Sequence, residues 1–365
     1  MKAARLRILH VVGARPNFMK AAPVVKALSR RSGVSQAVVH TGQHYDDNMS
    51  DVFFRQLGMP DPDINLDVGS GTHARQTAEV MIRLEPVLLD RRPDRVMVYG
   101  DVNSTLAAAL VCSKLLVPVA HVEAGLRSFD RTMPEEINRL LTDQLADLLF
   151  IHSEEAAGNL VKEGVPRDRI VFAGNTMIDT LVQLLDIALK SDENQALAPP
   201  GGKFALVTLH RPALVDNPAR LQAMLAALCQ VAGRLPVIFP MHPRTRGRVV
   251  ESGAGGLLDR LTVVPPLGYL EFLALEARAT VVITDSGGVQ EETTYLGVPC
   301  LTVRENTERP VTVRTGTNTL AGYDTAKLIG LVAEIMAGRY KRSSRPRLWD
   351  GKAAERIADA LAGVP

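Results

Sequence analysis

Short runs of apolar, often β-branched residues alternate with longer amphipathic segments along almost the whole chain. In the first half the runs predict strands at 6–12, 34–40, 95–99, 117–122, 148–152 and 170–173, separated by helices at 19–30, 46–57, 76–89, 104–115, 135–145 and 154–163. In the second half they predict strands at 204–209, 236–240, 262–264, 281–284 and 299–303, and helices at 220–233, 269–276, 289–296 and 353–361. This alternation is typical of parallel sheets covered by helices on both faces.

The length of the chain predicts more than one domain. A chain of 365 residues exceeds what one core comfortably fills, so we expect two. A helical pattern from about 174 to 192 and a loop rich in Pro and Gly at 192–203 separate two α/β series. Two doubly wound domains joined by a hinge predict a ligand cleft between them, at the carboxyl ends of the strands.

Composition excludes several classes of protein. With 42 Lys+Arg against 40 Asp+Glu, the net charge of +2 does not favour nucleic acid or an acidic membrane surface. The three cysteines are far apart and match neither a disulfide framework nor a metal site, which favours a reducing compartment. The first apolar run contains His10 and lacks a cleavage pattern, and every long apolar stretch is interrupted, so we expect a cytoplasmic protein.

The stretch 281–292 is the clearest candidate ligand site. A β-branched run ends at Thr284 and is followed by Asp-Ser-Gly-Gly and a helical pattern. Free backbone N–H groups and the positive end of the helix dipole bind anions there, and Gly287 and Gly288 allow close approach. Glu292 follows about one turn later, a reach that suits the hydroxyls of a ribose. The alternative is a glycine turn that serves packing only.

Two basic residues follow the first strand. Arg15 and Lys20 lie near a helix start, where acids are usually preferred. Basic residues at that end are favourable if an anion binds there. The alternative is a solvated pair on the surface.

Three carboxylates in the first half also follow strands or begin a helix: Asp101, Glu123 and Glu135. Clustered acids shift one another's pKa values, so one can stay protonated and another ionised near neutral pH. This is the equipment of general acid/base catalysis. Structural alternatives are a helix cap at Asp101, Asn103 or Ser104, an ion pair of Glu123 with Arg127, and a capping box of Thr132 with Glu135.

The second half has two further polar strand ends. His210-Arg211 follows one strand and His242-Pro-Arg244 another, a pattern that favours anion binding. Neither histidine has a partner at helical metal-ligand spacing, so no metal is expected.

These motifs together resemble the non-hydrolysing UDP-N-acetylglucosamine 2-epimerases, whose two Rossmann-like domains are of the GT-B type. The resemblance covers nearly the whole chain through motifs at 13–20, 41–44, 100–101, 121–127, 134–139, 284–292 and 306–310. It implies an N-terminal domain at 1–173 with the acids, a UDP-binding domain at 174–345, and a C-terminal helix at about 346–365 that packs back on the first domain.

The resemblance implies a reversible inversion at C2 of UDP-GlcNAc, giving UDP-ManNAc for cell-surface polysaccharide, without metal or other cofactor. The route is anti elimination of UDP to a 2-acetamidoglucal, followed by re-addition. The implied catalytic residues are Asp101, Glu123, Glu135 and His210. The implied ligands of UDP and its diphosphate are Arg15, Lys20, Phe272, Ser286, Gly287, Gly288, Glu292 and Arg309. The family also implies a homodimer.

Two departures from the family concern a second UDP-GlcNAc that activates many bacterial members. By similarity its ligands would be Gln43, His44, Glu136, Arg211 and His242. Many of those members read His-Arg-Arg-Glu where this chain has His210-Arg211-Pro212-Ala213, and here Tyr45-Asp46 follows His44. Because an added acid would repel a diphosphate, we expect weak or absent activation. UDP-ManNAc should then be converted without added UDP-GlcNAc.

Other functions use some of the same residues. A hydrolysing 2-epimerase would release ManNAc and UDP, and a sibling enzyme would act on a UDP-2,3-diacetamido uronic acid. A GT-B glycosyltransferase would share the nucleotide site but would not need three acids in the other domain. A nucleotide-sugar-binding module would have no use for them.

Overall fold

The computed structural model describes residues 6–42, 57–199 and 201–363. All but the last residue of the helix expected at 46–57 lies outside the described residues. Gln43, His44 and the side chain of Arg15 lie outside them as well. The chain forms two compact units: unit 1 is Met1–Thr180 with Arg347–Pro365, and unit 2 is Leu181–Pro346. The division between them falls inside helix α7 (Thr176–Lys190), a little beyond the expected boundary at 173.

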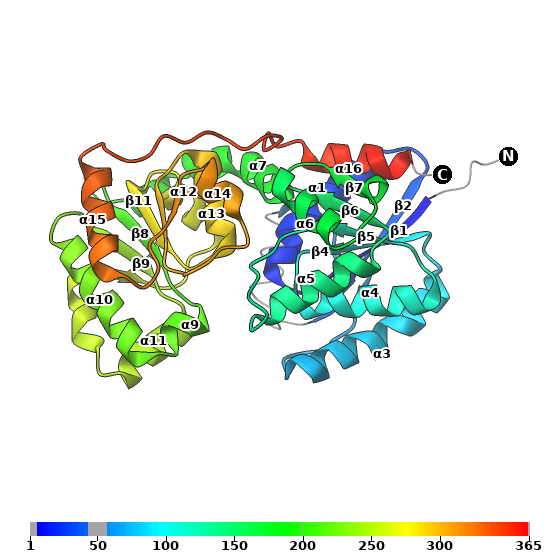
Figure 1. Cartoon of the computed structure of the whole chain (residues 1–365), viewed down its shortest axis with the longest axis horizontal. Coiled ribbons are helices and arrows are strands. Elements are labelled where there is room, and N and C mark those ends of the chain that lie inside the picture. The colour runs from blue at the N-terminus through cyan, green and yellow to red at the C-terminus, as the bar shows by residue number, and fades with distance from the viewer. Residues whose placement is uncertain (1–5, 43–56, 200, 364–365) are drawn as a thin grey trace. The chain divides into compact units, whose positions relative to one another are not determined.

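Unit 1 contains a seven-stranded sheet in the order β3-β2-β1-β4-β5-β6-β7, and all its pairings are parallel (Figure 1). Its strands are β1 (Leu6–Val12), β2 (Val34–His40), β3 (Ile64–Asn65), β4 (Arg95–Tyr99), β5 (Val119–Val122), β6 (Leu148–Ile151) and β7 (Ile170–Phe172). Its helices, besides the start of α7, are α1 (Arg15–Ser29), α3 (His73–Arg91), α4 (Asn103–Leu115), α5 (Pro134–Leu145), α6 (Glu154–Lys162), the short η1 (Arg167–Arg169) and α16 (Ala353–Ala362).

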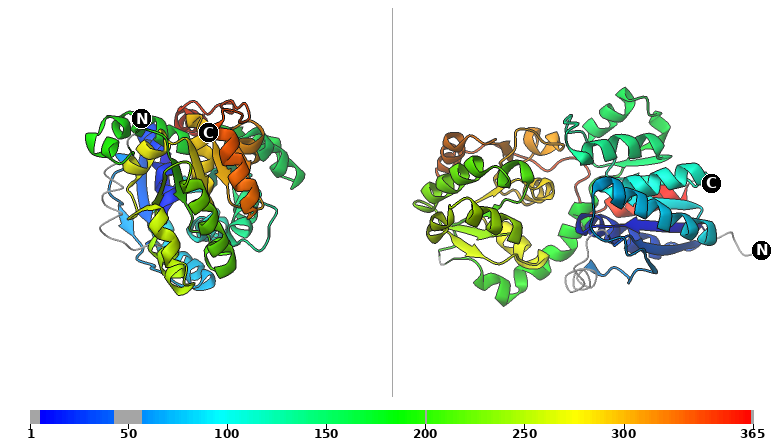
Figure 2. Two further views of the ribbon diagram at one scale, coloured as in Figure 1. Left: turned by 90° about the vertical axis from the view of Figure 1, so that its left-hand side faces the viewer. Right: turned by 90° about the horizontal axis from the view of Figure 1, so that it is seen from below.

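Unit 2 contains a six-stranded parallel sheet in the order β10-β9-β8-β11-β12-β13. Helices flank its strands in the two further views of Figure 2. Its strands are β8 (Ala205–Thr208), β9 (Val237–Pro240), β10 (Thr262–Val264), β11 (Val281–Thr284), β12 (Cys300–Thr302) and β13 (Asn318–Leu320). Its helices are α8 (Asp192–Ala196), α9 (Pro212–Val215), α10 (Pro218–Ala232), α11 (Pro243–Glu251), η2 (Gly255–Arg260), α12 (Tyr269–Glu276), α13 (Gly287–Leu296), α14 (Pro310–Arg314) and α15 (Thr325–Met336).

The core of unit 2 shows why its strands are nearly continuous apolar runs. On β8, Ala205 and Val207 belong to one buried cluster, whereas Leu206 belongs to another. On β11, Ile283 belongs to the first of these clusters and Val282 to the second. Successive side chains point to opposite faces of a strand, so both faces of this sheet are buried under helices. The predicted fold class, two doubly wound parallel sheets, is confirmed.

Several parts of the predicted pattern were wrong in detail, and helices α9, α11 and α14 were not predicted. Helix α1 begins at Arg15 rather than Met19, and the expected loop at 192–203 contains α8. No strand was predicted at 60–66, where the structure has β3, and the last predicted strand, at 299–303, is followed by β13 and α15. Strands of two or three residues are too short to show a period of two.

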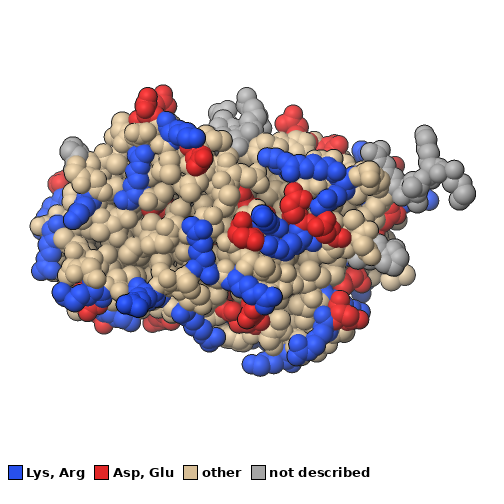
Figure 3. All heavy atoms as spheres, turned by 90° about the horizontal axis from the view of Figure 1, so that it is seen from above, with Lys and Arg blue, Asp and Glu red and all other residues tan. Residues whose placement is uncertain are grey.

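The surface carries both signs of charge. Figure 3 shows basic and acidic side chains interspersed over the face that it displays. Among the described residues no helix is both long and apolar enough to cross a membrane.

Candidate functional site

Three adjacent strands of unit 1 bring predicted site residues together. The strands β5, β4 and β1 are neighbours, so the residues after their carboxyl ends lie at one edge of the sheet. There Lys20, from the second turn of α1, forms an ion pair with Glu123. Both side chains are only 6% exposed, which excludes the alternative of a solvated surface lysine. A buried pair of this kind is costly to break from one side, because a bare charge remains.

Gly100 provides the space for this ion pair. Its φ of +63° favours glycine, and a Cβ there would lie 2.8 Å from Lys20 Nζ and 3.2 Å from Glu123 Oε2. Asn17 fixes the same region, because its Nδ2 donates to the Tyr99 carbonyl (2.7 Å) and its Oδ1 accepts from the Gly13 N–H (3.1 Å). The turns after β1 and β4 are therefore tied together around Lys20 and Glu123.

Glu123 has an unusual backbone conformation. Its φ is +74°, which is rare for a residue with a side chain. The N–H groups of Glu123 and Ala124 both donate to the Phe150 carbonyl at 3.0 Å. Such conformations persist only where surrounding structure enforces them, and they cluster at functional sites.

Asp101 lies beside a second buried ionic group. It pairs with Arg139 of α5, which also binds Glu136 at 2.7 Å. Glu136 also accepts from the backbone N–H groups of Ser128 and Phe129, each at 2.9 Å. Burial raises the pKa of Glu136, but these N–H donors and Arg139 outweigh it and leave the pKa below its usual value. Glu136 thus ties the 128–129 loop to α5.

A histidine and an aspartate form a buried hydrogen-bonded chain that ends at the turn preceding Asp101. His121 is fully buried in β5, and its two ring nitrogens lie 2.7 Å from Asp143 Oδ1 and 2.8 Å from the Gly100 carbonyl oxygen. Burial raises the pKa of Asp143, but His121 and Arg127 outweigh it, so the pKa is lowered. Neither Asp143 nor His121 was among the predicted site residues.

The structure contradicts the three structural alternatives for the acids. Helix α4 has Val102 and helix α5 has Met133 as N-cap, and neither makes a side-chain cap. Instead Ser104 contacts Thr41, and Asn103 donates to Gln76.

The proposed ion pair of Glu123 with Arg127 is also absent from the described part of the chain. Arg127 pairs with Asp143 and Glu163 rather than with Glu123. Thr132 donates to Asp130, and Glu135 is half-buried in the first turn of α5.

In unit 2 the turn after β11 has the predicted form. Ser286 is the N-cap of α13 and makes no side-chain cap, so the N-terminal turn keeps its N–H groups for another acceptor. Gly287 is packed against a cation, because a Cβ there would lie 2.5 Å from Arg309 Nη1. Arg309 is held by Glu291 (3.1 Å) and by Glu308. An arginine that is itself paired with two carboxylates thus lies beside the helix N-terminus.

Asp285 organises the neighbouring strand end. Its carboxylate accepts from the backbone N–H groups of His210 (2.9 Å) and Arg211 (2.8 Å), and the His210 ring Nδ1 lies 3.2 Å from it. Partial burial lowers the pKa of His210, and the charge of Asp285 offsets this only in part. Asp285 was not among the predicted site residues, although its place directly after a strand was a signal for it.

Glu292 lies in a buried group of acids on the inner side of α13. It is 4% exposed and accepts a hydrogen bond of 2.8 Å from the Tyr269 hydroxyl. Burial raises the pKa of Glu292 to about 7. Phe272, one turn after Tyr269 on α12, is half-buried.

Of the residues proposed for a second ligand, Glu136 belongs to unit 1, and Arg211 and His242 belong to unit 2. His242 caps α11, because its Nδ1 accepts from the Arg244 N–H (3.2 Å). Glu136 has the structural contacts given above, and Gln43 and His44 lie outside the described residues.

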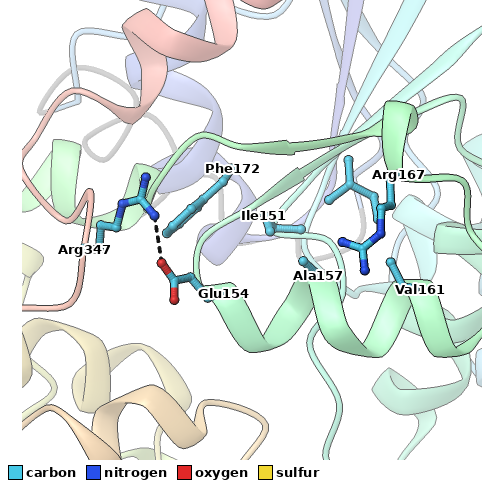
Figure 4. A pocket seen from close by; sticks show the side chains of 8 residues that line it. Ile151, Glu154, Ala157, Val161, Arg167, Phe172 and Arg347 are labelled. Atoms are coloured by element: carbon cyan, nitrogen blue, oxygen red, sulfur yellow. Dashed lines mark hydrogen bonds and ion pairs between the residues drawn. The ribbon is translucent and has the colours of Figure 1, made fainter.

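A hollow of about 330 Å³ lies between α6 and β7, at the edge of the sheet of unit 1 (Figure 4). It is lined by apolar side chains of both elements and by two arginines. Arg347 pairs with Glu154 at 2.9 Å and lies over the ring of Phe172. None of the predicted site residues lines it.

The fold and the two groups of strand-end residues define a protein of two doubly wound domains, with a buried acid–lysine pair in one and a glycine turn beside an arginine in the other. The family model for UDP-N-acetylglucosamine 2-epimerase matches residues 26–362. The chain belongs to this family, as its motifs predicted.

Two curated relatives are equally similar to the chain. It is 44% identical over 364 residues to the UDP-N-acetylglucosamine 2-epimerase of Methanocaldococcus jannaschii, covering 98% of this chain and 99% of the relative. It is 44% identical over 360 residues to the UDP-2,3-diacetamido-2,3-dideoxy-D-glucuronate 2-epimerase of Pseudomonas aeruginosa, with the same coverage. A crystal structure of the Methanocaldococcus jannaschii UDP-GlcNAc 2-epimerase with UDP-GlcNAc and UDP is 43% identical, with a TM-score of 0.90 over 98% of this chain and 99% of that chain.

Proposed function

We propose that the protein interconverts UDP-GlcNAc and UDP-ManNAc by reversible inversion at C2, without net hydrolysis. The observation that carries the proposal is the buried pair of Lys20 and Glu123, with Glu123 at a positive φ, in a chain of this family. A strained, buried acid beside a lysine is poor design for stability alone and is typical of a catalytic centre.

Unit 2 is proposed to hold UDP. The N–H groups at the start of α13 and the guanidinium of Arg309 would bind the diphosphate, with Ser286, Gly287 and Gly288 lining the turn. Glu292 would accept hydrogen bonds from the ribose hydroxyls, and Phe272 would contact the base. The crystallised Methanocaldococcus relative binds UDP-GlcNAc and UDP, which supports this assignment.

Unit 1 is proposed to carry out the proton transfers. One carboxylate among Asp101, Glu123 and Glu135 removes the C2 proton while the C1–O bond breaks and UDP leaves, giving the 2-acetamidoglucal. A second group then returns a proton to the other face of C2, and UDP adds again at C1. Two carboxyl groups in different protonation states are needed for this sequence.

The leaving diphosphate gains negative charge as the C1–O bond breaks. Arg15, Lys20 and His210 are proposed to stabilise that charge, which lowers the barrier because the charge is largest in the transition state. In this role His210 acts by hydrogen bonding more than by charge near neutral pH, because its pKa is lowered.

A UDP-2,3-diacetamido uronic acid is the second candidate substrate. The chain is as similar to the Pseudomonas aeruginosa enzyme for that sugar as to the Methanocaldococcus enzyme for UDP-GlcNAc. The same acids would invert C2 in both sugars. Parallel assays with the two UDP-sugars separate the candidates by their kcat/KM ratio.

NMR of UDP-GlcNAc incubated with the enzyme in D₂O tests the proposal. Deuterium at C2 of both UDP-GlcNAc and UDP-ManNAc, with no loss of intact UDP-sugar, is the expected result. Accumulating free UDP and ManNAc would instead identify a hydrolysing enzyme.

The Glu123→Gln variant tests the assigned acid. The amide cannot exchange protons with C2, so epimerisation should fall by on the order of 10² or more while UDP still binds. Turnover equal to the wild type would remove Glu123 from the mechanism.

A further inference from the structure

A second acid lies behind the proposed ribose ligand. Glu276, the last residue of α12, is 0% exposed. Apart from a contact with another carboxyl group, neither carboxyl oxygen of Glu276 has a hydrogen-bond partner among the described residues. An ionised carboxylate in that position would have neither solvent contact nor a hydrogen-bond donor, which strongly disfavours the charged form.

The polar neighbour of Glu276 is the carboxyl group of Glu292. The two carboxyl groups are within hydrogen-bonding reach of each other. Carboxylates are acceptors only, so a hydrogen bond between two of them requires a proton on one. Tyr269 donates to Glu292 Oε1 at 2.8 Å, whereas no described N–H or hydroxyl group donates to Glu276, so the negative charge is better stabilised on Glu292 and the proton of the pair is better placed on Glu276.

The groups that face the pair favour one retained proton. They are the Tyr269 hydroxyl on α12, Glu291 on α13 and the Cys300 thiol on β12. Burial, followed by the charge of Glu292, raises the pKa of Glu276 well above its usual value. Burial and the charge of Glu291 raise the pKa of Glu292 to about 7, while Tyr269 and Glu276 lower it by hydrogen bonding. Because Glu276 is fully buried and has no other hydrogen-bond donor in the part of the chain that the structure describes, it is the member of the pair that keeps the proton.

We propose that Glu276 is a neutral carboxylic acid that donates a hydrogen bond to Glu292, and that UDP-sugar binding releases a proton from the pair. Glu276 is thus a positioning residue for the nucleotide site. The inference rests on the proposed function, in which Glu292 accepts the ribose hydroxyls.

The coupling follows from the chemistry of the ribose. Two adjacent hydroxyl groups donate two hydrogen bonds, and a carboxylate can accept both, whereas a protonated carboxyl group offers a competing donor. The ligand therefore binds the ionised form of Glu292 more tightly. By linkage, affinity must rise with pH and binding must release protons in the same range.

Calorimetric titration with UDP-glucose measures this release. Its diphosphate is a diester and does not titrate near neutral pH, and it lacks the 2-acetamido group of the substrate. Titrations of the whole protein in phosphate and Tris buffers, whose ionisation enthalpies differ, should show release of about half a proton near neutral pH. Affinity should rise about tenfold from about pH 6 to about pH 8.

Two substitutions at Glu276 separate proton donation from packing. Glu276→Gln keeps an N–H donor of similar size, so proton release and affinity should remain close to those of the wild type. Glu276→Met fills the space without a donor, so the midpoint of the pH profile should move upward and affinity near neutral pH should fall by about tenfold. Glu334→Gln, at an exposed position of α15, is the matched control and should change neither quantity.

The outcomes divide cleanly. If Glu276 were ionised, Glu276→Gln would remove a charge and move the pH midpoint downward, which would overturn the inference. UDP-glucose binding by the wild type without proton release would also overturn it and leave the proposed function intact. If folded wild-type protein does not bind UDP-glucose, the proposed nucleotide site itself is wrong. If Glu276→Met does not fold, the Glu276→Gln variant is sufficient. An unchanged pH midpoint of binding supports the inference, and a downward shift overturns it.

Discussion

At the scale of single residues, the acid edge of unit 1 depends on one position without a side chain. Gly100 has a φ of +63° and faces Lys20 and Glu123 across the space that a Cβ would fill. The ion pair and the glycine therefore require each other. Neither a motif nor a charge count reveals this, because the three residues are far apart in the sequence.

Replacing Gly100 by Ala should disturb the acids without affecting the nucleotide turn in unit 2. The left-handed φ costs about 1–2 kcal/mol, and the new methyl group must displace Lys20 or Glu123. We expect turnover to fall on the order of 10²-fold because catalytic groups are misplaced, and UDP affinity to fall by a much smaller factor because the contacts in unit 2 are kept. Steady-state kinetics and calorimetric titration with UDP measure the two effects.

Gly33 provides the matched control for this substitution. Its φ is +83°, but no atom lies within 4 Å of the position that a Cβ would take, so Gly33→Ala has the backbone cost without the collision. It should reduce stability and leave turnover normal. Equal loss of turnover in both variants would show that backbone strain, and not displacement of the ion pair, is responsible.

At the scale of elements, the last helix is held on unit 1 by a buried acid. Asp179 of α7 accepts from the backbone N–H groups of Ala353 (3.1 Å) and Ala354 (2.6 Å) at the start of α16. Burial raises the pKa of Asp179 to about 6, although these two N–H groups lower it. The folded protein therefore binds this proton more tightly than the unfolded chain does.

The stability contribution of Asp179 should consequently depend on pH. A raised folded-state pKa gives stability that is fully present below the unfolded value near 3.8 and is lost as pH rises through about 6. Relative to Asp179→Asn, which does not titrate, the wild type should lose about 2 kcal/mol of unfolding free energy from about pH 4 to about pH 7.

Trp349 is a suitable probe for this measurement. It is the only tryptophan of the chain, and its Nε1 donates to the His152 carbonyl (2.8 Å) close to α16. Urea titrations followed by its fluorescence should show the pH-dependent difference. The exposed Asp186 of α7 serves as control, since Asp186→Asn should track the wild type at every pH. A difference between wild type and Asp179→Asn that is constant with pH would contradict the linkage.

At the scale of the whole molecule, unit 1 is built from two separate parts of the chain. After unit 2 the chain returns at Arg347, and the buried face of α16 packs against α1. Unit 2 is one continuous segment, with its own two buried clusters. The two units should therefore differ in their dependence on the C-terminus.

Deletion of the residues from Arg347 onward should destabilise unit 1 selectively. The loss of the buried face of α16 should cost on the order of 5 kcal/mol in unit 1, by the area of apolar side chains uncovered. UDP should still bind unit 2. Limited proteolysis reports on the first effect and calorimetric titration on the second. Loss of UDP binding together with an intact unit 1 would refute the expectation.

The sequence by itself determined the class of fold, the family and the positions after strands where polar residues gather. These features are local, because the period of two, the glycine turn and the order of motifs are all encoded in contiguous residues. The tertiary structure decided which charges meet. Lys20 pairs with Glu123, Asp101 with Arg139, and Asp143 rather than Glu123 with Arg127. The acid behind Glu292 was likewise visible only in the fold, because helix α12 brings Glu276 to it. Contacts between distant segments depend on the sheet order, which no local pattern contains.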